Sequence, residues 1–337
     1  EDDVIWVHDY HFIPLCGYLR RAGCRNRIGF FLHIPWPPEE LLITHPNHES
    51  LVRELCTYDL IGFQTERDLS AFLGYVRKET NGEVRSNGVV KAFGRKTLTG
   101  VFPISIDAAK VSELAEMVDD KSRKPDLKDG APQPRMIIGV DRLDYTKGLL
   151  QRLEAYQHFL NAHTEYQRNV VFVQIAPPSR TDLHSYQMIS QQVESAVGHI
   201  NGSFADFDWS PVRYLNRGFK RQALLGFLRL SQVGLVTPLR DGMNLVAKEY
   251  VAAQPPEDPG VLVLSRFAGA AQELSGALLV NPYDIEGVSD ALATALAMPL
   301  EERRERWEVM LKRLKQFDIV TWRESYLQAL QGVVDAA

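Results

Sequence analysis

The stretch VGLVTPLRDGMNLVAKEYVAAQ, residues 233–254, decides the fold class. An apolar run leads into a turn that contains Gly242, and a segment with helical spacing follows. This order of strand, turn and helix is typical of phosphate-binding sites, because the unpaired N–H groups at the start of a helix carry positive partial charge. The stretch therefore predicts an α/β unit with an anion site at residues 244–246.

Similar apolar runs recur along the chain, and segments with helical spacing separate them. This alternation is typical of strands and helices around parallel sheets. We predict strands at residues 4–7, 27–32, 60–63, 101–103, 136–140, 170–175, 212–214, 233–236 and 261–264.

The length of 337 residues, with 45% hydrophobic residues, favours two domains. The polar segment MVDDKSRKPDLKDGAPQP, residues 117–134, indicates the boundary between them. We expect a first domain at residues 1–130, a second at residues 131–317, and a C-terminal helix at residues 318–337 that packs back on the first domain. The first residues already have the pattern of a buried strand, so the first domain is expected to be incomplete.

Composition and charge exclude several classes of partner. A net charge of -5 gives no general basic surface for nucleic acid, and no apolar run is long enough to span a membrane. Without a signal-peptide pattern, the protein is expected to be soluble and cytoplasmic. The 3 cysteines lack CxxC spacing and the 9 histidines lack HExxH, so we expect buried thiols and no metal. The possibility of a homo-oligomer stays open.

Two carboxylates in the first stretch are candidates for ligand binding. Asp241 lies in the turn and Glu249 about two turns into the helix, so each could hold a different part of one extended ligand. The same residues equally suit an N-cap at Asp241 and a solvated helix position at Glu249.

A second segment, IIGVDRLDYTKGL at residues 137–149, places Arg142 and Lys147 after an apolar strand. Ligands of open α/β sheets bind at the carboxyl ends of the strands, and two cations there suit a diphosphate. The alternative is an ordinary ion pair with Asp141 or Asp144.

In the first half, WVHDYHFIPL and GFFLHIPWPP place Asp9 and His33 at the ends of two apolar strands. A histidine in an apolar run is more often a hydrogen-bonded core residue than a catalyst. Asp9 is the stronger candidate, because burial of an unpaired charge is costly.

The motifs WVHDYH, GFFLHIPWP, DLIGFQTERD, VDRLDYTKGL, HINGSF, TPLRDGMNLVAKEYVAAQ and VLVLSRFAGAAQEL together resemble those of the trehalose-6-phosphate synthases. The resemblance runs along essentially the whole chain, without the family's N-terminal segment. It implies a GT-B architecture, in which two Rossmann-like domains with parallel sheets face a central cleft. It also implies a retaining glycosyltransferase that makes trehalose 6-phosphate and UDP from UDP-glucose and glucose 6-phosphate, with a role in osmoprotection.

The resemblance also implies roles for single residues. The catalytic set would be Asp9, His33, Arg142, Lys147 and Asp241, with Asp9 on the acceptor and His33 and Asp241 on the transferred glucose. Glu249 would hold the ribose and the backbone near Phe219 the uracil. The donor would be bound by Arg142, Lys147, Phe219, Asp241, Gly242, Met243, Asn244, Leu245, Val246, Ala247, Lys248 and Glu249.

The resemblance favours front-face attack assisted by the leaving phosphate, with Arg142 and Lys147 in place of a metal and with no cofactor. His199 would bind the acceptor where the family is expected to have an arginine, which predicts weaker phosphate binding or a different acceptor. Two alternatives stay open: a related transferase with another acceptor or donor, of the glucosylglycerol phosphate type, and a non-catalytic homologue that binds sugar phosphates.

Overall fold

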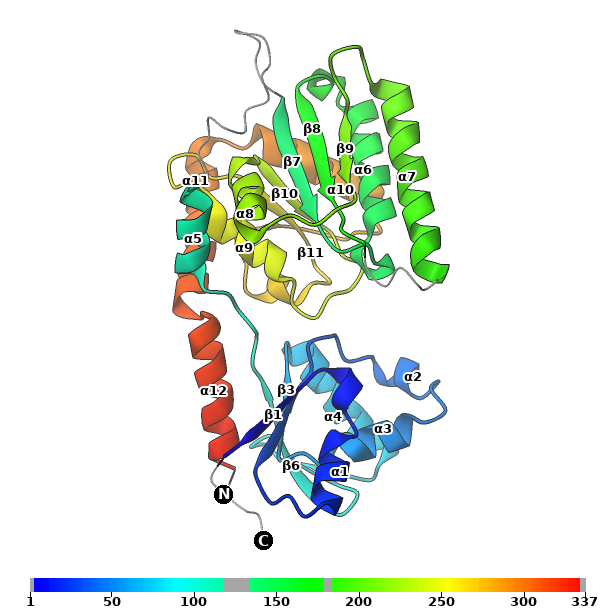
Figure 1. Ribbon diagram of the computed structural model, residues 1–337, viewed down its shortest axis with the longest axis vertical. Coiled ribbons are helices and arrows are strands. Elements are labelled where there is room, and N and C mark those ends of the chain that lie inside the picture. The colour runs from blue at the N-terminus through cyan, green and yellow to red at the C-terminus, as the bar shows by residue number, and fades with distance from the viewer. Residues whose placement is uncertain (1–2, 118–133, 179–183, 334–337) are drawn as a thin grey trace. The chain divides into compact units, whose positions relative to one another are not determined.

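The computed structural model describes residues 3–117, 134–178 and 184–333. The chain forms two compact units, Glu1–Ser105 with Phe317–Ala337, and Ile106–Gln316. Within the described ranges, each unit contains one six-stranded sheet flanked by helices (Figure 1).

The first unit has the strand order β1-β2-β3-β6-β5-β4. The first four strands in this order are parallel, whereas β5 and β4 join β6 as antiparallel hairpins. The strands are β1 (Ile5–His8), β2 (Ile28–Phe31), β3 (Leu60–Phe63), β4 (Glu83–Val84), β5 (Val89–Ala92) and β6 (Arg95–Val101). The helices are α1 (Leu15–Arg21), α2 (Glu39–Leu42), α3 (His48–Leu55), α4 (Glu66–Glu79) and α12 (Ile319–Gln331), with the 3-10 helix η1 (Tyr10–Phe12).

Helix α12 covers one face of this sheet, and α1, α3 and α4 contribute to the core on the other. Tyr326 of α12 donates a hydrogen bond to the carbonyl oxygen of Phe30 at 3.0 Å. A Cβ atom at Gly29 or Gly62 would lie 2.5 or 2.7 Å from the Tyr326 ring or hydroxyl. The two glycines therefore make room for this tyrosine against the strands.

The second unit is a parallel sheet with the order β12-β11-β10-β7-β8-β9. Its strands are β7 (Arg135–Val140), β8 (Val170–Ile175), β9 (Val212–Leu215), β10 (Val233–Val236), β11 (Val261–Ser265) and β12 (Leu278–Val280). The chain moves outward from β7 through β8 and β9, then returns to β10 on the other side. The strand order therefore reverses between β7 and β10, which is where open α/β sheets bind ligands.

Helices cover both faces of the second sheet. Helices α6 (Leu149–Ala162), α7 (His184–Phe204) and α10 (Ile285–Ala297) share one core with the strands, and the others pack on the opposite face (Figure 1). These others are α5 (Ala108–Glu116), α8 (Arg221–Leu230), α9 (Leu245–Ala253) and α11 (Leu300–Gln316); short 3-10 helices are η3 (Tyr145–Lys147), η4 (Thr164–Tyr166) and η5 (Gly269–Gln272).

The division between the units differs from the sequence prediction. The predicted boundary lies after residue 130, whereas the first unit gives way to the second after Ser105. Helix α5 accounts for the difference, because its buried Val111 and Ala115 pack in the second unit and Ser112 donates a hydrogen bond to the carbonyl oxygen of Ala252 at 2.7 Å. Residues 118–133 of the predicted linker lie outside the described residues.

Candidate functional site

The start of α9 lies just beyond the carboxyl end of β10. Asn244 has a left-handed conformation, with φ of 80°, and its side-chain oxygen accepts a hydrogen bond from the Ala247 amide at 3.0 Å. Asn244, and not Asp241, is therefore the N-cap of the helix. The side-chain nitrogen of Asn244, Nδ2, also donates a hydrogen bond to Oδ2 of Asp241 at 3.1 Å.

Lys147 and Asp241 form an ion pair across the point where the strand order reverses. Lys147 ends η3, which follows β7, and its Nζ lies 2.6 Å from Oδ2 of Asp241 in the turn after β10. Both side chains are about five-sixths buried, at 16% and 17% exposure. Asp144 instead caps η3 through the Thr146 amide at 2.8 Å, so the predicted alternative of a Lys147 pair with Asp141 or Asp144 is wrong.

Arg142 is exposed and has no ion-pair partner among the described residues. It directly follows Asp141, whose carboxylate is occupied by another cation, Arg152. The guanidinium of Arg142 is therefore available to an anion at the same end of the sheet as Lys147.

The turn at residues 237–243 is held by close backbone contacts. The Leu239 amide donates to the Thr146 carbonyl, and the Ala270 amide donates to the Met243 carbonyl, each at 2.8 Å. Gly269 is required here, because a Cβ atom at this position would lie 2.0 Å from the carbonyl oxygen of Gly242. These contacts fix the backbone that leads into α9.

Sequence reasoning missed the residue that joins these parts. Arg152 is 1% exposed and its guanidinium donates to Asp141 at 2.7 Å, Gln174 at 3.0 Å, Thr237 at 3.0 Å and the carbonyl oxygen of Lys147 at 3.2 Å. It thereby links β7, β8, the end of β10 and η3. Burial raises the pKa of Asp141, and the adjacent guanidinium of Arg152 counteracts that rise.

Further along α9, two charged residues have opposite environments. Glu249 is 17% exposed and lies 3.2 Å from Arg221 of α8. The pKa of Glu249 is raised, because the effect of burial exceeds the opposite effect of the Arg221 charge. The Lys248 side chain has no exposure and lies 2.5 Å from Glu273, which also pairs with Arg313 at 3.1 Å. The Lys248 side chain is therefore paired within the unit, and its predicted contact with the donor stays a prediction.

Phe219 lies in the loop before α8 and is half-buried. Its ring packs edge-on against Phe227 at 5.3 Å, and the Arg217 guanidinium lies over it at 4.9 Å. These contacts pack the Phe219 ring against α8.

Asp9 and His33 end neighbouring strands of the first unit. Asp9 follows β1 with a left-handed φ of 71°, and one of its carboxylate oxygens is buried with no hydrogen-bond partner among the described residues. His33 follows β2, and its Nε2 lies 3.0 Å from Nδ1 of His8. Burial lowers the pKa of both histidines, so both are neutral near pH 7.

The sequence matches the model of Glycosyltransferase family 20 over residues 1–332. The trehalose-6-phosphate synthase of Sinorhizobium fredii is 51% identical over 334 residues, which are 99% of this chain and 72% of that protein. The enzyme of the same name from Sodalis glossinidius is 46% identical over 100% of this chain and 71% of its own length. The chain belongs to glycosyltransferase family 20.

Solved structures of similar proteins agree with this placement in glycosyltransferase family 20. An alpha,alpha-trehalose-phosphate synthase (UDP-forming) from Burkholderia xenovorans, in complex with glucose-6-phosphate, has a TM-score of 0.93 at 49% identity over 98% of this chain and 74% of that one. An E. coli protein bound with UDP-2-fluoro glucose has a TM-score of 0.96 at 46% identity over 99% and 74%. The predicted α/β class and GT-B fold are confirmed.

One predicted site residue lies away from the others. His199 is exposed on α7, whose Tyr186 donates to Asp144 at 3.3 Å. Thirteen residues of helix separate Tyr186 from His199, which is roughly 20 Å along the axis. The structure therefore does not bring His199 to the Lys147–Asp241 pair.

No helix within the described ranges has the length and apolar character needed to cross a membrane. In the same part of the chain, no three His, Cys, Asp or Glu side chains gather in a way that could hold a metal ion.

Proposed function

We propose that the protein transfers glucose from UDP-glucose to glucose 6-phosphate with retention, giving trehalose 6-phosphate and UDP. The proposal rests on the Lys147–Asp241 pair at the reversal of strand order in a chain of glycosyltransferase family 20. Relatives with about half of their residues identical bear the name of this activity. Two similar structures hold glucose-6-phosphate and a UDP-glucose analogue.

The donor diphosphate would bind to Arg142, Lys147 and the first amides of α9. The N–H groups of Leu245 and Val246 head this helix, where intrahelical acceptors are lacking and the dipole favours negative charge. Arg142 supplies a guanidinium that has no ion-pair partner in the described part of the chain, and Lys147 a charge oriented by Asp241. Glu249, held by Arg221, would accept hydrogen bonds from the ribose hydroxyls.

Asp241 would contact the transferred glucose, and Asp9 the acceptor. The unpartnered buried oxygen of Asp9 supports this role, because a buried carboxylate oxygen needs a donor and a sugar hydroxyl can provide one. The strained backbone of Asp9 is also typical of functional positions. His33, which is neutral near pH 7, would serve as a hydrogen-bonding group for the donor sugar and not as a cation.

In the reaction, the bond from the glucose anomeric carbon to the β-phosphate oxygen breaks, and the acceptor hydroxyl attacks that carbon from the same face. The acceptor proton passes to the departing phosphate oxygen. Negative charge grows on UDP during this step, so Arg142 and Lys147 stabilise the transition state more than the bound substrate.

Incubation with UDP-glucose and glucose 6-phosphate tests the proposal, with UDP release measured by chromatography and product configuration by NMR. We expect equal amounts of UDP and α,α-linked trehalose 6-phosphate. The Lys147→Met variant should lower kcat by about 100-fold or more, on the usual scale for a lost transition-state charge contact. Lys315→Met, an exposed cation on α11, is the matched control and should leave kcat unchanged.

Three outcomes would contradict parts of the proposal. Transfer to another phosphorylated acceptor, without product from glucose 6-phosphate, would make the protein a related transferase of different specificity. UDP-glucose binding without turnover would make it a non-catalytic homologue. An unchanged kcat in Lys147→Met would remove the role of the Lys147–Asp241 pair.

A further inference from the structure

A large cavity lies at the opposite edge of the first sheet from Asp9 and His33. It has a volume of about 1270 Å³ and is lined by residues that precede β2 and β3, including Arg27 and Asp59. Asp9 and His33 follow the carboxyl ends of β1 and β2. Six residues of extended chain separate Arg27 from His33, which is roughly 20 Å. The cavity is therefore separate from these proposed acceptor residues.

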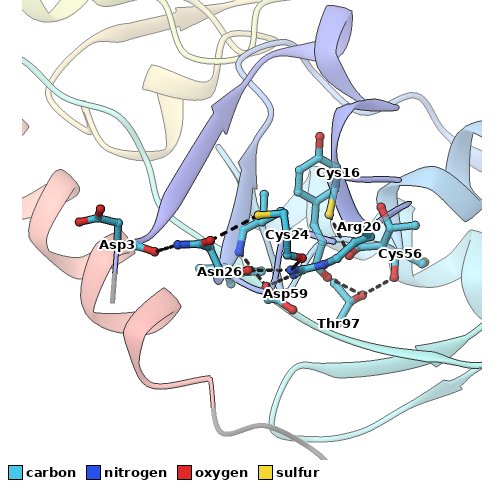
Figure 2. A network of polar contacts seen from close by, with 12 residues as sticks. Asp3, Cys16, Arg20, Cys24, Asn26, Cys56, Asp59 and Thr97 are labelled. Atoms are coloured by element: carbon cyan, nitrogen blue, oxygen red, sulfur yellow. Dashed lines mark hydrogen bonds and ion pairs between the residues drawn. The ribbon is translucent and has the colours of Figure 1, made fainter. Parts of the chain in front are cut away.

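The wall of the cavity contains one carboxylate among its described residues, and that carboxylate is already paired. Asp59 accepts hydrogen bonds from the Arg20 guanidinium at 2.6 Å and from the Ile28 amide at 2.7 Å (Figure 2). Arg20 also donates to the carbonyl oxygens of Cys24 at 3.1 Å and Asn26 at 2.7 Å. The Arg20–Asp59 pair is thus a fixed part of the wall.

Neutral polar groups in the wall and next to it also have hydrogen-bond partners. Figure 2 shows the Asn26 amide donating to the carbonyl oxygen of Asp3 at 2.8 Å and accepting from the Cys24 thiol at 3.4 Å. The Thr97 hydroxyl lies 3.0 Å from the carbonyl oxygen of Cys56. The wall therefore has a defined geometry that does not depend on a ligand.

Two arginines at the cavity have no ion-pair partner among the described residues. Arg25 lies just after the turn at Gly23, which has a φ of 87°, and Arg95 begins β6 after the tight turn at Phe93 and Gly94, with φ of 52° and 73°. Both side chains belong to exposed residues. Two separate turns thus direct guanidinium groups to one cavity.

The charge balance of the lining is strongly positive. Besides Arg20, Arg25 and Arg95, the cavity is lined by Arg27, Arg85 and Lys96. Arg27 donates to the carbonyl oxygen of Gln331, which leaves its charge uncompensated, and Arg85 pairs with Glu83 at 2.8 Å. Guanidinium groups bind phosphate oxygens in bidentate fashion, and a cluster of them attracts polyanions.

We propose that this cavity binds a small anion with two or more phosphate groups, held between Arg25 and Arg95. The volume exceeds what one orthophosphate would occupy and lies above the range of about 300–1,000 Å³ that is typical of pockets for drug-sized ligands, so a ligand with several phosphate groups has room. The site goes beyond the glucosyl transfer proposed above, since it uses none of the donor or acceptor residues. Its ligand would bind together with the substrates.

Calorimetric titration of the whole chain with inorganic tripolyphosphate tests the proposal, with UDP present in excess to occupy the donor site. We expect one tripolyphosphate per chain and affinity that decreases with added salt. Arg25→Gln and Arg95→Gln should each weaken binding about tenfold or more, as expected for a lost charge-assisted contact. Arg77→Gln, which removes an exposed cation from α4 outside the cavity, is the control and should bind tripolyphosphate normally.

Each alternative result overturns the proposal. Unchanged affinity in both Arg25→Gln and Arg95→Gln would exclude the cavity as the site. Loss of binding in Lys147→Met, with the two cavity variants unaffected, would assign the anion to the donor site. Orthophosphate that binds as tightly as tripolyphosphate would contradict the requirement for two phosphates. Without tripolyphosphate, Arg25→Gln and Arg95→Gln should transfer glucose at the rate of the parent chain. Loss of tripolyphosphate binding can therefore be told apart from loss of the proposed transferase activity.

Discussion

Replacement of Arg152 by methionine should destabilise the second unit by about 4 kcal/mol near neutral pH. Arg152 and Asp141 have side-chain exposures of 0% and 2%, so the substitution leaves a buried carboxylate without its cation. Removal of one partner of a buried ion pair costs about 3–5 kcal/mol. The hydrogen bonds to Gln174, Thr237 and the Lys147 carbonyl are lost as well, although the methionine side chain retains part of the packing.

The cost should grow with pH. Burial already raises the pKa of Asp141 in the folded chain, and loss of Arg152 raises it further. Between the unfolded and folded pKa values the native state binds more protons, so the free energy of unfolding falls as pH rises. The difference between Arg152→Met and the parent chain should therefore be smaller at pH 5.5 than at pH 8.

Hydrogen exchange on peptides from β7 and α6, measured across a urea series, reports the free energy of unfolding of the second unit separately from the first. The double variant Asp141→Asn, Arg152→Met removes both charges and should recover at least half of the loss, whereas Lys315→Met should match the parent. A loss below about 1 kcal/mol, which is the typical effect of a surface or unexceptional substitution, would refute the buried-pair account. So would equal losses at the two pH values.

Three further outcomes are expected. Arg142→Ala should lower kcat about 100-fold or more with a smaller change in KM, measured as UDP release, because the lost contact acts mainly on the departing diphosphate. The acid limb of the kcat/KM profile attributable to His33 should lie below pH 6.5, since burial lowers its pKa, and His33→Gln should remove that limb. His199→Arg should leave the KM for glucose 6-phosphate unchanged, since His199 lies roughly 20 Å along α7 from the end that contacts Asp144; tighter binding in a KM measurement would restore the role implied by the resemblance.

Buried strands were the most predictable part of the fold. The predictions at residues 60–63, 170–175 and 233–236 agree with β3, β8 and β10, each buried along its whole length. The prediction at residues 101–103 is wrong, because β6 runs over Arg95–Val101 and has polar residues at its exposed start. The short strands β4 and β5 were missed for a similar reason, since these partly exposed segments lack a continuous apolar run. Strand β12 was missed although its sequence, LLV, is apolar, because it is only 3 residues long.

At the candidate site, the grouping of residues that follow strand ends could be predicted, whereas other contacts between residues distant in sequence could not. Lys147 and Asp241 could be placed together because both follow strand ends at one edge of a parallel sheet. The motif predicts only that a helix starts near residue 245. It does not indicate that the Lys248 side chain points into the core towards Glu273. Arg152 gave no clear signal, because it stands beside Gln151 in the helical segment LLQRLEAY, and its acceptors include residues distant in sequence such as Gln174 and Thr237.

The packing of Tyr326 on Gly29 and Gly62 has a consequence for the order in which the chain folds during synthesis. The first sheet is translated early, yet the helix that covers one of its faces begins more than 200 residues after the last strand of that sheet. Until α12 emerges from the ribosome, Phe31 and the groove over the two glycines remain open to water. The second unit is continuous in sequence and contains its own core. It can therefore complete its folding before the first unit, although the ribosome makes it later.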